Sequence, residues 1–489
     1  MKGTRSRLIT AGNLRREAQN LRDRGGRIQF VYAWCPREKD TELRYIAAVP
    51  DQKDFEAWIL RGAASVPTLA SIWPLLGWHE RETMDLYGIK FEDHPEPYPL
   101  VLWQDHPRHV NGTHLTQHRQ GNGGQYLPLI EGEDVQQLPF GPVRADVLES
   151  AEFTFFYVGE HIIHYQPRLF FKHRGMESRF ESCDPERAVI VAERVSAVGS
   201  VAHALAYCEA VERAAGCIVP VRARALRVLL AELERLYNHL HYLGHLCHTT
   251  TLKVGEAQGK LLEETAKQLN GKLTGSRFLR SILVPGGLRR DLKPDQWLGE
   301  QLEALRVEFA AYVERLEESE SHLDRLITTG VLSQRVAFDQ GATGPVERAS
   351  GLDRDLRRDH PYAYYGSLPV GVATNDEGDA YARARVRIAE AETSFALCQR
   401  ILLLLEPGDV RSACEPQPMS EGLGWAESPR GSLFYAVHIG EDGRLARVKI
   451  KSPSFSNWRA FPFTVHDSNM MDYAINEASF GLTIAGCDR

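Results

Sequence analysis

A leucine stripe that begins after residue 220 constrains the fold of this chain more than any other sequence feature. Its leucines recur three or four positions apart, which is the spacing of one face of an α-helix. Pro220 stands just before the stripe, and proline is favoured in the first turn of a helix because its missing N–H is not needed there. The stripe consists of Leu226, Leu229, Leu230, Leu233, Leu236, Leu240 and Leu243. A helix of this length buries its apolar face against other helices, so the sequence predicts a helix-rich body.

Strand-like runs at both ends place this body in an α+β fold. Runs rich in β-branched and aromatic residues cover 28–34 and 43–49 near the start, and 433–439 and 446–450 near the end. A strand pair is expected around 153–158. Helical patterns cover 71–85, 187–215, 260–269, 296–328 and 379–405. We therefore expect a small N-terminal α/β domain, followed by a helix-rich domain that has β segments at both ends.

A shift in composition between these two parts indicates a linker. The chain has 489 residues, which is too long for one ordinary core. Residues 104–137 are rich in Gly, Asn, Gln and Pro and contain His106, His109, His114 and His118. The irregular spacing of these histidines favours a linker over a metal site. The predicted division is a domain over 1–103, a Gly/His-rich linker over 104–137 and a second domain over 138–489.

Composition and charge exclude several functional classes. The net charge is −7, and Lys and Arg are interspersed with acids, so a nucleic acid partner is not expected. No run approaches the roughly 20 apolar residues that cross a bilayer, and residues 1–24 lack the apolar core of a signal peptide. The chain is therefore predicted to be cytoplasmic. None of its eight cysteines forms a Cys-x-x-Cys pair, so it is not expected to hold an iron–sulfur cluster or zinc by itself.

One motif near the N-terminus is long and mixed in residue type. Residues 78–89 read W-H-E-R-E-T-M-D-L-Y-G-I and are followed by His94 and Pro95. This stretch resembles the signature of the 30-kDa subunit of respiratory complex I. In that family the module is structural and docks against the 49-kDa subunit. Its helically spaced charges are also typical of a solvated or interface face.

Motifs in the second half occur in the order of a second family. They lie at 137–142, 168–177, 202–207, 286–291, 348–351, 359–362, 427–431 and 487–489. Together they resemble the 49-kDa subunit of complex I and, more closely, the large subunit of formate hydrogenlyase. The chain is thus identified as a fused 30-kDa/49-kDa-type subunit of the superfamily that unites complex I and the membrane-bound nickel–iron hydrogenases.

The resemblance does not extend to the nickel ligands. A nickel–iron hydrogenase holds its metals with four thiolates from two Cys-x-x-Cys pairs, because soft, bridging sulfur is needed. The corresponding positions here are Ser196, Gly199, Thr483 and Gly486, and none is a thiol. Cys487 stands alone and one residue out of register. Nickel chemistry is therefore not expected, and no cofactor is assigned to this chain itself.

Quinone chemistry of the complex I type is doubtful on the same comparison. In complex I a His, a Tyr and an Asp hydrogen-bond the quinone headgroup. Those places hold Arg144 (or Val143), Ala197 and Thr249 in this sequence. An arginine can donate a hydrogen bond but cannot give up a proton at neutral pH.

Several polar residues around the emptied site are retained. The resemblance implies that Arg174 faces the terminal iron–sulfur cluster of a neighbouring subunit, although it can equally pair with Glu177. Glu177 aligns with a proton-relaying acid, and His203 either lines the pocket or is a core histidine. Arg430 matches an arginine that contacts the iron's diatomic ligands, and Asp488 is expected to pair with Arg194 or Arg430.

Two functions remain open at this point. One is an oxidoreductase subunit, of the NADH:quinone oxidoreductase or hydrogenase-like kind, whose large-subunit site has been repurposed. The other is a redox-silent scaffold that couples cluster-bearing and ion-translocating subunits. An active nickel hydrogenase or quinone reductase ranks below both. The resemblance implies a small iron–sulfur subunit and antiporter-like membrane subunits as partners, with this chain peripheral on the cytoplasmic face of the membrane.

Overall fold

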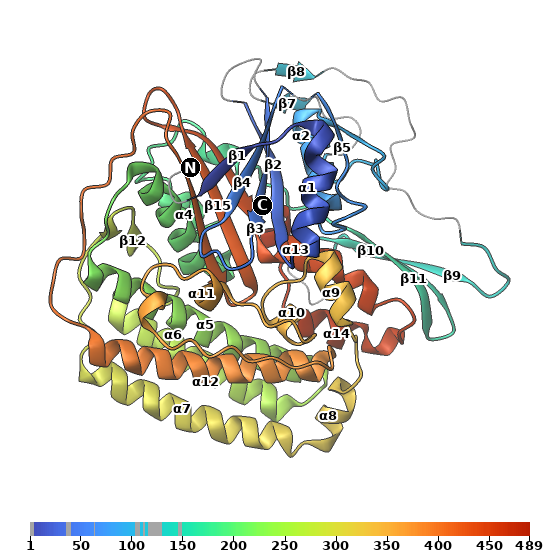
Figure 1. Cartoon of the computed structure of the whole chain (residues 1–489). Coiled ribbons are helices and arrows are strands. Elements are labelled where there is room, and N and C mark those ends of the chain that lie inside the picture. The colour runs from blue at the N-terminus through green and yellow to red at the C-terminus, as the bar shows by residue number, and fades with distance from the viewer. Residues whose placement is uncertain are drawn as a thin grey trace.

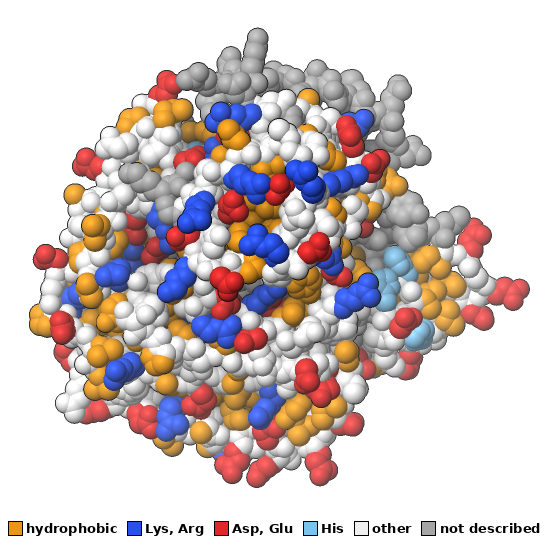
Figure 2. Space-filling view, in the orientation of Figure 1, with side chains coloured by type: hydrophobic (Ala, Val, Ile, Leu, Met, Phe, Trp, Pro, Cys, Tyr) orange, Lys and Arg blue, Asp and Glu red, His pale blue; other side chains and the backbone are white. Residues whose placement is uncertain are grey.

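Two β-sheets packed face to face form the centre of the molecule, with helices on both outer sides (Figure 1). The structure, a computed structural model, describes residues 4–35, 41–62, 64–102, 108–110, 113–115, 130–144 and 149–489. The fold is α+β, with strands near both ends and helices between them, as the sequence predicts. On the face shown in Figure 2, basic and acidic side chains are interspersed rather than gathered into one basic patch.

The N-terminal sheet has the order β1-β4-β3-β2 and is covered by one helix of its own. Strand β3 is antiparallel to both of its neighbours, β2 and β4, and β1 is parallel to β4. The elements of this part are β1 (Arg5–Leu8), α1 (Ala11–Asp23), β2 (Arg27–Trp34), β3 (Glu42–Ala48), β4 (Glu56–Arg61), β5 (Ser65–Pro67), α2 (Leu76–Tyr87) and β6 (Lys90–Glu92). The 30-kDa-like signature therefore forms helix α2.

Both faces of this sheet are buried, because successive side chains of a strand point to opposite sides. Val31 and Ala33 of β2 belong to the apolar cluster that includes α1. Phe30, Tyr32 and Trp34 belong to the large core of the second domain. Phe30 packs against Phe434 with ring centroids 5.6 Å apart. The N-terminal module thus shares a core with the rest of the chain.

The second central sheet is a meander of β14 (Glu421–Ser428), β15 (Gly431–Ile439) and β16 (Leu445–Lys451). Helix α4 (Ser200–Ala215) lies against β14 at very short range. A Cβ atom at Gly424 would collide with the carbonyl oxygen of Ala206, and one at Gly422 with that of Ala210. Small residues on both surfaces therefore allow the helix backbone to touch the sheet.

The predicted leucine stripe lies on helix α5 (Val221–Thr249), and all seven of its leucines are buried. This helix packs in a bundle with α6 (Lys253–Thr274), α7 (Gln296–Glu317) and α12 (Ala380–Leu404). Figure 1 shows α7 and α12 running side by side along the edge farthest from the N-terminal sheet. No helix in the described part of the chain has an apolar stretch long enough to cross a bilayer.

Two predicted helices are interrupted. The helix expected over 187–215 is wrong as a single element, because α3 (Val189–Ala192) ends before a turn, η2 (Ala197–Gly199), and α4 then begins. Ser196 is extended, with φ −141° and ψ 120°, which no helix accommodates. The helix expected over 296–328 also breaks, since α7 ends at Glu317 and α8 (Glu320–Leu326) follows.

The remaining elements surround this framework. A sheet of β9 (Gln136–Phe140), β10 (Glu152–Val158) and β11 (His161–Arg168) projects away from the body in Figure 1. The short pair β7 (Arg108–Val110) and β8 (Thr113–Leu115) lies in the predicted linker. The other elements are η1 (Ser178–Phe180), β12 (Leu283–Val284), β13 (Gly287–Leu288), α9 (Gln334–Gln340), α10 (Pro345–Arg348), α11 (Leu356–Asp359), η3 (Tyr365–Ser367), α13 (Pro453–Ala460), η4 (Phe461–Thr464), η5 (Met470–Asp472), α14 (Tyr473–Phe480) and α15 (Ile484–Asp488).

The predicted division at 103, 104–137 and 138 stays a prediction. His106 and His118 lie outside the described residues, as do the side chains of His109 and His114, so the linker interpretation is not tested there.

Candidate functional site

The four positions expected to carry nickel-binding cysteines meet at one place. Ser196 and Gly199 lie in the turn before α4, and Thr483 and Gly486 lie at the start of α15. Ser196, Gly199 and Gly486 line a cavity of about 10 Å³. A Cβ atom built at Gly486 would be 2.5 Å from Thr483 Oγ1 and 3.5 Å from Ser196 Oγ. The two segments thus approach each other as closely as a shared site requires.

The side chains at these positions do not fit a nickel–iron centre. Thr483 Oγ1 accepts the Gly486 N–H at 3.2 Å and hydrogen-bonds Ser454 Oγ at 3.1 Å, so it serves as a helix cap. Hydroxyl groups are hard ligands that stay protonated near neutral pH, and the two glycines supply no ligand atom. Cys487 is buried outside the cavity lining, and burial raises the pKa of its thiol well above the usual value.

Two of the predicted polar residues, His203 and Arg430, do line this cavity. His203 Nδ1 hydrogen-bonds the Tyr435 hydroxyl at 2.8 Å, and burial, reinforced by the charge of Arg174, lowers the pKa of His203 to about 3. The imidazole is therefore neutral at physiological pH. Arg430 donates to the Gly481 carbonyl oxygen at 2.6 Å and to Asn238 Oδ1 at 2.9 Å.

Burial lowers the pKa of Arg430 to about 10, so the guanidinium is still charged at neutral pH. The cavity has room for a single water molecule at most, since a water needs about 10–15 Å³. The arrangement places one positive charge and a neutral imidazole around a space of that size. Its lining offers hydrogen-bond donors to a small polar species but no thiolate or carboxylate for nucleophilic chemistry.

Glu177 lies elsewhere, in an ion cluster that connects helix α2 with strand β16 and the last residue. Its carboxylate is 2.7 Å from Arg447 Nη2, 3.0 Å from Lys449 Nζ and 3.4 Å from Arg489 Nη1. Glu82 of the 30-kDa-like signature joins the same cluster, 2.7 Å from both Lys449 Nζ and Arg489 Nη2. Although burial alone would raise it, these cations lower the pKa of Glu177 to about 2. Glu177 does not line the cavity, and these ion pairs favour its charged form, so the proton-relay role stays a prediction.

Arg174 does not pair with Glu177 either. It is exposed and donates to the backbone oxygens of Arg194 at 3.1 Å, Val195 at 2.6 Å and Ala485 at 3.2 Å. It therefore ties together the two segments that carry the emptied ligand positions. Its exposed end remains compatible with the predicted position facing a partner subunit.

Asp488 also differs from expectation. It pairs with neither Arg194 nor Arg430; its Oδ2 atom accepts the Lys172 N–H at 2.9 Å. Burial raises the pKa of Asp488 to about 7. It lies next to Cys487 on α15 and outside the lining of the cavity. Asp488 thus connects the backbone at Lys172 with helix α15.

The positions aligned with quinone ligands do not converge on the cavity. Arg144 forms a bidentate ion pair with Glu477 at 3.0 and 3.1 Å, and Val143 is exposed on the surface. The Thr249 hydroxyl donates to the Leu246 carbonyl oxygen at the end of α5. None of these residues, nor Ala197, lines the cavity.

Sequence reasoning missed two residues that support the site from α5. Glu234 accepts the N–H groups of Val201 and Ala202 at 2.7 and 2.9 Å and so caps α4. Burial raises its pKa to about 7. Asn238, four residues on, holds Arg430. The sequence does place an acid and an amide, Glu234 and Asn238, one turn apart on the helix that carries the leucine stripe. Polar groups buried on such a helix need hydrogen-bond partners, and this could have pointed to both residues.

Comparisons with known proteins agree with this arrangement. Residues 8–112 match the respiratory-chain NADH dehydrogenase 30 Kd subunit, and residues 262–421 and 413–489 match the 49 Kd subunit. Residues 174–274 match the nickel-dependent hydrogenases. The N-terminal, middle and C-terminal parts of the chain therefore each match a different family model.

Individual relatives match most of the chain. Formate hydrogenlyase subunit 5 of Escherichia coli is 30% identical over 467 residues, which is 92% of this chain and 82% of the relative. NADH-quinone oxidoreductase subunit 4 of Thermus thermophilus is 31% identical over 368 residues, 68% of this chain and 88% of the relative. A chain in the structure of the membrane-bound sulfane sulfur reductase, an archaeal respiratory membrane complex, matches with a TM-score of 0.68 and 25% identity, covering 73% of this chain and 99% of that one. The protein belongs to the family of fused 30-kDa and 49-kDa complex I-type subunits that include a nickel-hydrogenase-like domain.

Proposed function

We propose that this chain is the large-subunit-like member of a membrane-associated, complex I-like oxidoreductase that has no nickel–iron site. The observation that supports this is that Ser196, Gly199 and Gly486 line one cavity of about 10 Å³, with Thr483 in contact with Gly486 beside it. The fold keeps the geometry of a shared site, while the donor atoms that would bind nickel and iron are missing. Redox chemistry then belongs to an iron–sulfur cluster of a small partner protein, and this chain positions that cluster.

The exposed Arg174 supports the place proposed for the partner. It lies over the two segments of the emptied site and uses only backbone acceptors there, so its outer side is available to a second chain. A positive charge near a cluster favours its reduced form. Together with antiporter-like membrane subunits, such a partner would keep this chain peripheral on the cytoplasmic side of the membrane.

The direct test is metal analysis by mass spectrometry on the complex purified from its own cells. Iron without nickel is the expected result. About one nickel per chain would overturn the proposal and restore a hydrogenase function. Exchange of Arg174 for Met should shift the redox potential of the partner's cluster, whereas the same exchange at Arg222, an arginine paired with Asp291, should not.

A redox-silent scaffold is the second candidate, and the fully satisfied cavity favours it. His203 and Arg430 both have hydrogen-bond partners within this chain, and the space between them is no larger than a water. Electron paramagnetic resonance of the intact complex separates the two functions. A substrate-dependent change in the terminal cluster signal that is altered by Arg430→Met indicates a working site, and an unaltered signal indicates a scaffold.

A further inference from the structure

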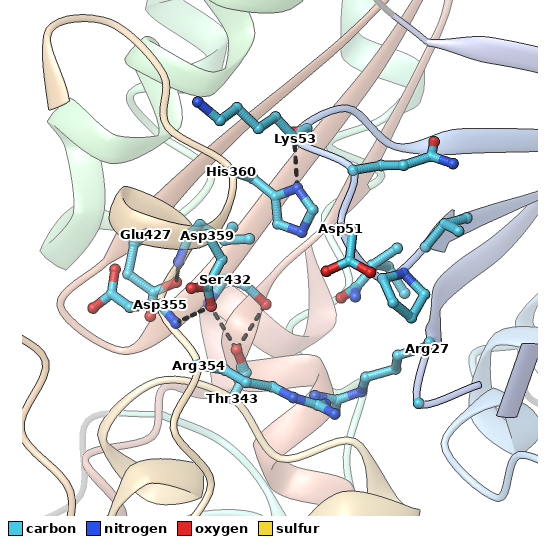
Figure 3. A pocket seen from close by; sticks show the side chains of 18 of the residues that line it. Arg27, Asp51, Lys53, Thr343, Arg354, Asp355, Asp359, His360, Glu427 and Ser432 are labelled. Carbon is cyan, nitrogen blue, oxygen red and sulfur yellow. Dashed lines mark hydrogen bonds between the residues drawn. The ribbon is translucent and has the colours of Figure 1, made fainter. Parts of the chain in front are cut away.

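A second cavity lies between the N-terminal sheet and the segment around α11, and it is separate from the emptied site. Its volume is about 460 Å³, and it shares no lining residue with the smaller cavity. One wall is formed by the start of β2 and the turn after β3, including Asp51 and Lys53. The opposite wall is the segment around α11, and Figure 3 shows side chains from both walls facing one another. Sites for small molecules are common at such interfaces between domains.

The charges in this cavity are unevenly compensated. Four of the five carboxylates in its wall have an arginine partner: Glu347 with Arg27 at 3.1 Å, Asp355 with Arg357 at 2.8 Å, Asp359 with Arg358 at 2.7 Å and Glu427 with Arg348 at 3.2 Å. Among the described residues, Arg354 and Lys53 have no ion-pair partner, whereas Asp51 is the only carboxylate of the lining without one. The groups left without a partner therefore sum to one positive charge.

Arg354 is the residue in the lining with an unmet hydrogen-bonding need. Its Nη1 atom is buried and has no acceptor within the described structure. A buried donor left without a partner costs about 1–3 kcal/mol, so such groups mark places where a partner is absent. Figure 3 shows the guanidinium group of Arg354 pointing toward that of Arg27.

These two guanidinium groups are held together by the fold. Both lie over the ring of Phe338, Arg354 at 4.9 Å and Arg27 at 6.0 Å from its centroid. Burial, with a smaller contribution from the charge of Arg354, lowers the pKa of Arg27 to about 10. Glu347 compensates the charge of Arg27 at 3.1 Å, so the positive charge left uncompensated beside this ring is that of Arg354.

We propose that this cavity binds a small organic anion whose phosphate or carboxylate group lies between Arg354 and Arg27. The planar fork of a guanidinium group matches both kinds of oxyanion in a bidentate way. A volume of about 460 Å³ is within the range of small-molecule sites and suits a molecule the size of a nucleoside monophosphate. Thr343 and Ser432 also line the cavity, and their hydroxyl groups hydrogen-bond each other. A ligand held there touches both domains and stabilises their contact.

Isothermal titration calorimetry on the purified full chain tests this site. The probes are adenosine monophosphate, citrate and inorganic phosphate. At least one of the first two is expected to bind with a dissociation constant between about 10 µM and 1 mM. Arg354→Met keeps the aliphatic stem over Phe338 but removes the charge, and it should weaken binding at least tenfold. Arg385→Met is the control, because Arg385 is exposed and pairs with Glu317 at 3.0 Å, and neither of these residues lines the cavity.

Each result decides a point. Binding of the monophosphate or citrate that Arg354→Met weakens and Arg385→Met leaves unchanged supports the proposal. Equal affinity for inorganic phosphate and the monophosphate supports an anion site without an organic ligand and overturns the organic part. No binding of any probe at about 10 mM, or equal binding by the Arg354 variant, overturns the whole proposal. If Arg354→Met does not fold, Lys53→Met on the exposed opposite wall replaces it, with a weaker loss of affinity expected.

Discussion

Replacing Glu177 by Gln tests whether Glu177 belongs to a structural ion cluster that stabilises the fold. The substitution keeps the shape of the side chain but leaves Arg447, Lys449 and Arg489 with Glu82 as the only carboxylate of the cluster. The pKa of Glu177 falls from 4.5 to about 2 in the folded protein, and the group is fully buried. A shift of this size corresponds to about 3 kcal/mol of stability at pH 7, in the range for breaking one buried ion pair.

The sign of the pH dependence follows from the lowered pKa. The carboxylate stabilises the folded state above its unfolded pKa, and this contribution is lost as the pH falls toward 2. The difference in unfolding free energy between the wild type and Glu177→Gln should therefore shrink from about 3 kcal/mol at pH 7 to about half of that at pH 3.

The assay is urea unfolding followed by fluorescence and circular dichroism, compared where the two signals coincide. Glu303→Gln is the control, because Glu303 pairs with Arg306 at 2.7 Å on the exposed surface and should change nothing measurable. Equal midpoints for the wild type and Glu177→Gln at pH 7, or a difference that is the same at pH 3, would refute the assignment of Glu177 to a structural ion cluster.

Three further predictions concern the site and its support. Gly424→Ala should destabilise the protein by about 1–3 kcal/mol, because its methyl group would collide with the Ala206 carbonyl; an unchanged melting temperature contradicts the close packing of α4 on β14. His203 should show no titration between pH 5 and 8 by NMR, and a midpoint near 6.5 would mean that it is not buried as described. Gly486→Ala should be destabilising by about 1–3 kcal/mol because its Cβ atom would lie 2.5 Å from Thr483 Oγ1, and Thr483→Ala should relieve part of the cost; strict additivity of the two changes would show that they do not touch.

Local periodicity predicted the parts of the fold that depend on one element alone. The leucine stripe of α5 was predicted because a helix of that length repeats its apolar face many times. The break before α4 was not, since residues 187–198 contain neither proline nor glycine. It depends on Glu234, which lies more than 30 positions away and caps the new helix.

The same limit applies to the candidate site. The convergence of residues 196–199 with 483–486 follows from the family resemblance. The place of Glu177 does not, because its partners come from β16, from the last residue and, through them, from α2. A motif fixes which residues are present, but the charges that surround a buried carboxyl group are set by tertiary contacts. The protonation state of Glu177 therefore could not be predicted from the sequence.

The position of Arg430 beside the emptied site has a structural cause that is independent of chemistry. Arg235 of α5 donates to the backbone oxygens of Glu427 at 2.6 Å and Ser428 at 3.2 Å, which fixes the turn that carries Arg430. Arg235 also belongs to a buried network with Glu390 of α12, so the turn is tied to the helix bundle. Removing one member of such a network leaves an uncompensated buried charge. The turn is thus held in place for the stability of the bundle whether or not a ligand binds beside it.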